Sequence, residues 1–92
     1  MAKKMTLSVL RSERAENLMD KFLTHADHAK NLVCAGYKFV EVRKEQLKAA
    51  QAWGDLNEEG LLDVAVEIYP QEKERLMDYK EIYCEFKTEE SL

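Results

Sequence analysis

The sequence contains few residues that interrupt regular structure, with 3 glycines and 1 proline among 92 residues. Linkers and low-complexity segments are usually rich in such residues and have too few apolar side chains to fold. In this chain 46% of the residues are hydrophobic, which is enough for a core. The composition therefore predicts one small ordered domain over residues 1–92, with frayed ends at 1–4 and 88–92.

Long apolar runs are absent as well. The uninterrupted apolar stretches are a few residues long, whereas a membrane-spanning helix needs roughly 18–20 such residues. The basic start at Lys3 and Lys4 is not followed by an apolar run of the length that a signal peptide requires. We therefore expect no membrane partner and a cytoplasmic location.

Cysteine is scarce and familiar catalytic motifs are missing. Cys34 and Cys84 lie far apart and outside any CxxC pair, which predicts that both are reduced and mostly buried. The sequence contains no nucleophile elbow and no glycine-rich phosphate loop. The adjacent carboxylates of Glu58 and Glu59 are more typical of a solvated turn than of an acid and base pair. The sequence thus predicts a protein that is not an enzyme and binds no cofactor.

The net charge of −4 is unevenly distributed. Residues 1–54 contain 10 basic and 6 acidic side chains, a net charge of +4. Residues 55–92 contain 4 basic and 12 acidic side chains, a net charge of −8. Such a division is informative about binding partners and electrostatic steering, although it says nothing about the fold.

Hydropathy patterns predict an α+β fold. Apolar residues at three- and four-residue steps predict a helix between Ser12 and Gly36 and a second helix from Arg43 to Trp53, ended by Gly54. Strands are predicted at 5–9, 37–42, 61–69 and 79–87, where apolar residues alternate or β-branched and aromatic residues gather.

The resulting order is β-α-β-α-β-β, with two helices packed on one face of a small sheet of three to four strands. Residues 37–44 remain open to either a helical or an extended interpretation. The charged segment 71–78 allows a short helix opened by Pro70. The predicted core includes Leu18, Phe22 and Val64.

Two histidines are the only candidates for metal ligation. His25 and His28 lie three residues apart on the first predicted helix, so their side chains are neighbours that can share a divalent ion in principle. No third ligand occurs four residues away on the same helix, and two ligands do not make a site. We therefore predict no metal site and interpret the pair as solvated histidines, with a pH-sensitive contact as the alternative.

A short basic cluster is the candidate for nucleic-acid contact. Arg43, Lys44 and Lys48 lie within about one turn of the second predicted helix, where they are able to contact phosphates. Acidic residues are interleaved with the basic ones throughout this half of the chain, and such mixed faces are usually only solvated.

The acidic half suggests a protein-binding face. If the strands 61–69 and 79–87 pair with their apolar sides inward, four carboxylates and three tyrosines point outward. These residues are Asp63, Glu67, Tyr69, Tyr79, Glu81, Tyr83 and Glu85. Tyrosine suits protein interfaces, and carboxylates select basic partners. The alternative is an ordinary wet sheet face whose glutamates oppose aggregation.

Small size, the missing catalytic motifs and the divided charge together predict a non-enzymatic binding protein. It would inhibit or regulate a larger host protein or nucleoprotein complex with a basic surface. Size and charge layout are typical of accessory proteins of phages and mobile elements, which include anti-CRISPR and other anti-defence inhibitors. The alternative is a structural or oligomerising α+β module. We expect a monomer rather than a homodimer.

Overall fold

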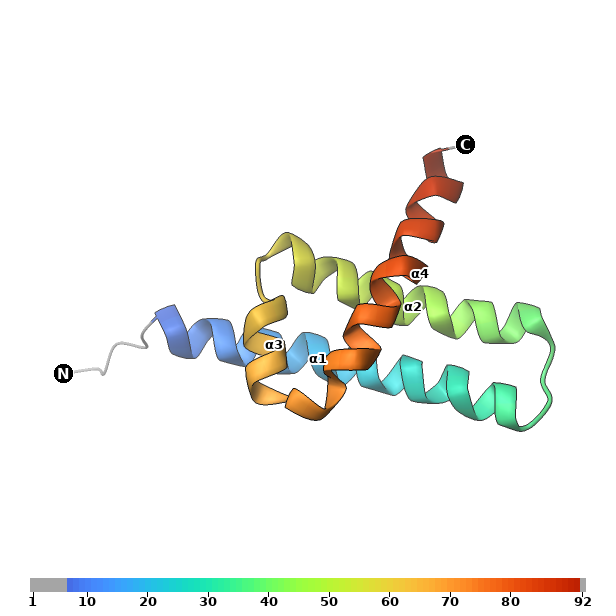
Figure 1. The fold of residues 1–92 in the computed structure, drawn as a ribbon, viewed down its shortest axis with the longest axis horizontal. Coiled ribbons are helices and arrows are strands. Elements are labelled where there is room, and N and C mark those ends of the chain that lie inside the picture. Colours follow the sequence, from blue (N-terminus) through green and yellow to red (C-terminus); the bar gives the residue numbers. More distant parts are fainter. Residues whose placement is uncertain (1–6, 92) are drawn as a thin grey trace.

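In the computed structural model, which describes residues 7–91, the chain is all-α. The elements along these residues are α1 (Leu7–Cys34), α2 (Phe39–Glu58), α3 (Leu62–Ile68), the 3-10 turn η1 (Pro70–Glu72) and α4 (Lys73–Ser91). Figure 1 shows α1 and α2 side by side as an antiparallel hairpin, with α4 crossing this pair and projecting beyond α2. The predicted α+β fold is wrong, because the described range contains no strand and hence no sheet.

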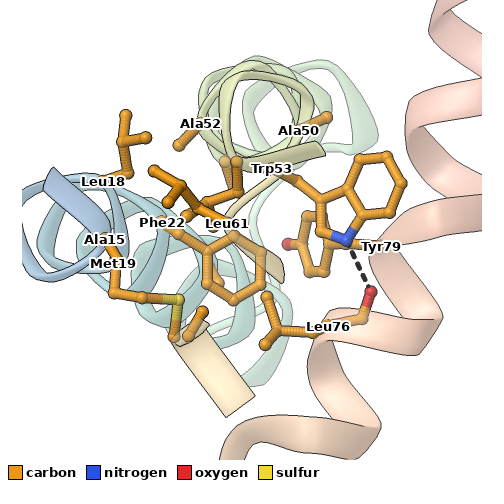
Figure 2. Close-up of a cluster of buried hydrophobic side chains, with 14 residues drawn as sticks. Ala15, Leu18, Met19, Phe22, Ala50, Ala52, Trp53, Leu61, Leu76 and Tyr79 are labelled. Atoms are coloured by element: carbon orange, nitrogen blue, oxygen red, sulfur yellow. Dashed lines mark hydrogen bonds between the residues drawn. The ribbon is translucent and has the colours of Figure 1, made fainter. Parts of the chain in front are cut away.

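The helices pack around one apolar cluster, to which all four contribute (Figure 2). Leu18 and Phe22 of α1 are fully buried, as predicted, whereas Val64 is partly buried against the cluster. The rings of Phe22 and Tyr79 meet edge to face with centroids 4.9 Å apart. The indole Nε1 of Trp53 donates a hydrogen bond of 2.8 Å to the backbone carbonyl of Leu76, which fixes α4 to α2.

The hairpin turn confirms the predicted role of Gly36. This glycine has φ 79°, a left-handed conformation that side chains disfavour. Directly after it, the N–H of Tyr37 donates to the carbonyl of Leu32 at 2.9 Å, the long bond of a Schellman motif. The motif stops α1 and turns the chain back toward α2.

Gly54, by contrast, does not end the second helix. It is buried inside α2, where the ring of Tyr83 packs so closely that an added Cβ would collide with it. The helix continues to Glu58, and Gly60, with φ 67°, forms the stop. Gly54 therefore serves close helix packing, which the sequence pattern alone does not distinguish from a helix end.

The segment 61–69 is helical although its apolar residues alternate. Its two fully buried residues are Leu61 and Ala65, one helical turn apart. In so short a segment the same residues satisfy a strand pattern and a helix pattern, and packing on α1 decides between them.

The segment 79–87 lies within α4. Its core-facing residues follow steps of three and four and are Tyr79, Ile82, Tyr83 and Phe86. Pro70 opens the 3-10 turn that leads into this helix. Residues 71–78, for which the sequence allowed a short helix, are helical, but they belong to this turn and to the beginning of the long helix α4.

The predicted strands at 5–9 and 37–42 are also wrong over the residues that the structure describes. Residues 37–42 comprise the hairpin loop and the first turn of α2, and residues 7–9 are the first turn of α1. Residues 5 and 6 and the predicted frayed end 1–4 lie outside the described residues. Of the predicted frayed end 88–92, residues 88–91 belong to α4 and residue 92 lies outside the described residues. None of the helices in the described range is both long and apolar enough to cross a bilayer.

Candidate functional site

The predicted tyrosine and carboxylate face has no sheet to carry it, because its residues lie on α3 and α4 and in the loop between α3 and η1. Tyr79 is buried in the core, and this burial raises the pKa of its phenol. Tyr83 is half-buried and packs against Trp53 with the rings tilted by 43° and their centroids 5.0 Å apart. The four carboxylates are exposed, and two of them, Glu81 and Glu85, line a common groove.

This groove, which we call the α2–α4 groove, has a volume of about 1260 Å³. It lies between the first turns of α2 and residues 77–88 of α4. Its lining residues are Phe39, Arg43, Met77, Lys80, Glu81, Cys84, Glu85 and Thr88. Phe39 and Met77 are 73% and 63% exposed, so large apolar side chains of both helices face solvent at this groove.

Arg43 joins the two walls of the α2–α4 groove. Its guanidinium carbon lies 4.3 Å from the ring centroid of Phe86 and 5.6 Å from that of Phe39. One of its nitrogens lies 3.5 Å from a carboxylate oxygen of Glu85. The structure therefore places this predicted nucleic-acid contact within the packing of α2 against α4.

The two lysines of the predicted basic cluster also have carboxylate neighbours. The Nζ of Lys44 lies 3.9 Å from Glu41, and the Nζ of Lys48 lies 3.3 Å from Glu45. These neighbours reduce the positive field that Lys44 and Lys48 present to a phosphate. Nucleic-acid contact by this cluster stays a prediction.

The most organised polar cluster of the described residues joins α1 to α2. His25 Nδ1 and His28 Nδ1 each lie 3.0 Å from the same oxygen, Oε1 of Glu45. All three candidate ligand atoms lie within 4.8 Å of one another. We call this group the His–His–Glu cluster.

Helical periodicity explains how the cluster forms. His25 continues the buried stripe of Leu18 and Phe22 along α1, and Glu45 lies between the buried positions Val42 and Ala49 of α2. Each therefore occupies a position that faces the other helix of the hairpin. His28 lies one turn further along α1, with 59% of its side chain exposed, and reaches the same carboxylate from the rim.

Glu45 is held as a carboxylate. The hydrogen bond with His25 is the main cause that lowers its pKa to about 2, with His28 and Lys48 adding to the effect against the cost of burial. Only 16% of its side chain is exposed. At neutral pH, the largely buried side chain of Glu45 is therefore an anion that faces two imidazoles.

Glu45 was not among the predicted ligands, because it lies on a different helix from the two histidines. The signal was present in the sequence, since Glu45 is a charged residue at a stripe position of α2, but only the pairing of α1 with α2 connects it to His25. A second groove, of about 830 Å³, reaches the cluster, and His28, Glu45, Tyr37 and Lys48 are among its lining residues.

The cysteines differ from expectation. Cys34 and Cys84 are both free thiols, as predicted, but both are exposed rather than buried. Cys34 ends α1, and Cys84 lines the α2–α4 groove.

Comparisons with known proteins give no further assignment. No protein-family model, curated protein or solved structure matches the chain. The function must therefore be argued from the two sites described above.

Proposed function

We propose that the protein is a non-enzymatic binding protein that inhibits or regulates a larger protein complex by holding a partner segment in the α2–α4 groove. The observation that carries this proposal is the exposure of Phe39 and Met77 on facing walls of one groove. A groove between two helices with apolar side chains on its walls suits an amphipathic helix, whose apolar face enters it.

Charge indicates which amphipathic helix would fit. Exposed carboxylates recur at steps of three and four along α4, at Glu74, Asp78, Glu81 and Glu85. Because Glu85 is paired with Arg43, Glu81 is the better candidate of the two groove carboxylates for contact with a partner. Lys80 also lines the groove, so the acidic excess lies along the exposed side of α4 as a whole rather than inside the groove. The occupant should therefore carry basic residues beside its apolar face, where they would meet these carboxylates.

Two parts of the proposal come from chain length and charge alone, namely the nucleoprotein nature of the partner complex and the likeness in size to phage accessory inhibitors. The cytoplasmic location comes from the lack of a long apolar run in the sequence. The groove supports the binding step itself and the chemistry of the surface that is bound.

Two matched double variants test the groove. Phe39→Asp with Met77→Asp places two charges on its walls, and Leu10→Asp with Val33→Asp places two charges at exposed apolar positions that do not line it. Each protein would be used to capture partners from a nuclease-treated lysate of the native host, and the captured protein would then be purified and titrated. We expect the groove variant to bind at least tenfold more weakly and the control variant to bind like the wild type. Equal binding by the groove variant, with unchanged circular dichroism, would overturn the proposal.

The charge argument has its own test. Reversing Glu81 to Lys should mainly slow association with the purified partner and reduce its dependence on salt, because exposed charges at a rim steer the encounter. An unchanged association rate would mean that the acidic side of α4 does not face the partner.

Self-association is the competing function. A structural module would use the same exposed residues to pair with a second copy. Light scattering of the pure protein at micromolar concentration separates the two, since the binding protein should be monomeric. A dimer that dissociates in the Phe39→Asp and Met77→Asp variant would assign the groove to self-association instead.

A further inference from the structure

The His–His–Glu cluster lies outside the α2–α4 groove and has a chemistry of its own. It contains both histidines of the chain and one carboxylate, brought together by two helices. We propose that His25 Nδ1, His28 Nδ1 and Glu45 Oε1 form a binding site for a divalent transition-metal ion, with Zn²⁺ as the best-fitting ion.

The spacing of the three atoms supports this proposal. At zinc–ligand distances of about 2.0–2.1 Å, two ligands of a tetrahedral ion lie about 3.3 Å apart. Both nitrogen–oxygen distances in the cluster are 3.0 Å, and the whole set lies within 4.8 Å. The two nitrogens lie up to 4.8 Å apart, whereas two ligands of one zinc ion span at most roughly 4.1 Å, so side-chain rotation must bring them closer. His28, with 59% of its side chain exposed, has room to turn.

The donor types also select the ion. Two imidazole nitrogens and one carboxylate oxygen suit zinc and its neighbours, whereas calcium and magnesium prefer oxygen ligands alone. To donate to the carboxylate, each Nδ1 carries a proton. Metal binding therefore requires each imidazole to adopt the tautomer with that proton on Nε2, which frees the lone pair of Nδ1 for the metal. Three protein ligands leave a fourth coordination position for water.

The position of the site predicts a structural consequence. The ligands join α1 to α2 between the buried core and the hairpin loop, so a bound ion would cross-link the two helices. Any ligand that binds only the folded state raises its stability. Zinc should therefore raise the melting temperature of the wild-type protein.

A substitution of Lys48 distinguishes zinc binding at the His–His–Glu cluster from zinc binding elsewhere on the protein. The Nζ of Lys48 lies 3.3 Å from Oε2 of Glu45, so its positive charge opposes a cation bound to the other carboxylate oxygen. Lys48→Gln should strengthen zinc binding several-fold if Glu45 is a ligand. A site formed by the exposed thiols of Cys34 and Cys84 would not respond to this change.

The experiment is a calorimetric titration of the tag-free protein with ZnCl₂, with the visible spectrum of the Co²⁺ form as a second readout. We expect one ion per chain and tetrahedral cobalt absorption in the wild type and in the Cys34→Ser and Cys84→Ser double variant. His28→Ala and Glu45→Gln should each weaken binding at least tenfold and abolish the zinc-dependent rise in melting temperature.

Two results would overturn the proposal. One is zinc binding that persists in His28→Ala and Glu45→Gln but disappears with the cysteines. The other is the absence of binding to the wild type at micromolar zinc. His28→Ala guards against a folding artefact, because this side chain is mostly exposed and its removal should leave the circular dichroism unchanged.

Discussion

The two ends of the α1–α2 hairpin contain similar apolar side chains, which are buried at one end and exposed at the other. At the packed end, around Phe22 and Trp53, α3 and the first half of α4 cover the hairpin and exclude water. At the open end, residues 33–41 are all exposed, including Phe39 and Val40. An aromatic residue therefore stabilises the fold at one end and is available for binding at the other, and the covering helices make the difference.

α4 takes part in both regions. Leu76 and Tyr79 in its first half are buried in the core, whereas Met77 on its other side and the outer half of the helix border the α2–α4 groove. The residues of α4 that stabilise the fold and those that border the groove thus lie on different faces and in different parts of the helix. Substitutions that separate these two roles test the comparison directly.

The largest expected effect comes from one aromatic residue at each end. Phe22→Ala should cost about 3–5 kcal/mol of unfolding free energy, because it removes a fully buried ring that packs against Tyr79. Phe39→Ala removes the same ring from an exposed site and should change stability by less than about 1 kcal/mol. Urea unfolding measures both. Similar losses in the two variants would erase the distinction between the packed and open ends.

A smaller effect should follow from filling the close contact between α2 and α4. Gly54→Ala improves helix propensity by about 1 kcal/mol, but its Cβ collides with the ring of Tyr83. Overpacking of this kind typically costs about 1–3 kcal/mol, so we expect a net loss in thermal melts. In a Tyr83→Ala background the same substitution should become stabilising. A stabilising effect in the wild-type background would show that α4 does not press on Gly54.

The hydrogen bond that fixes α4 should contribute less. Trp53→Phe keeps an aromatic ring but removes the Nε1–H that donates to the carbonyl of Leu76 at 2.8 Å. Because Trp53 is buried, the smaller ring also leaves a cavity, whose cost adds to that of the lost bond. A bond of this type contributes about 0.5–1.5 kcal/mol. Hydrogen exchange of the α4 amides should become faster, while that of mid-α1 amides should change less. Equal changes in both helices would indicate that the bond does not act locally.

The smallest effect concerns an exposed ion pair and depends on pH. Arg14 donates two hydrogen bonds to Glu59, at 2.9 and 2.8 Å, and these lower the pKa of Glu59 below its ordinary value of 4.5. The pair therefore contributes stability above that value and loses it as the pH falls through the lowered pKa. Glu59→Gln should melt slightly below the wild type at neutral pH and equally in strong acid. Glu58→Gln, the same charge change one residue away, should show no such convergence.

The sequence alone determined the first helix stripe and part of the core. Leu18 and Phe22 follow a pattern of three and four residues that only a helix satisfies over so long a segment, and Gly36 marks the end of that helix through its unusual backbone conformation. Such signals are local, because each depends on residues within a few turns of one another.

The second half of the fold was beyond local reasoning. Strands were favoured by the alternation in 61–69 and by the β-branched and aromatic residues of 37–42 and 79–87. In the folded protein, however, apolar residues of 61–69 and 79–87 form helical faces that pack against α1 and α2. Short segments carry too few residues to separate the two periods, so tertiary packing decides. The predicted tyrosine face was lost with the strands that defined it.

The candidate sites divide in the same way. Residue types, the acidic character of residues 55–92 and the spacing of His25 and His28 belong to the sequence. Only the antiparallel pairing of α1 with α2 adds Glu45 to the histidines, and only the crossing of α4 over α2 makes a groove from Phe39 and Met77. Both sites join residues from different helices, and their proximity is a property of helix packing rather than of any spacing along the chain.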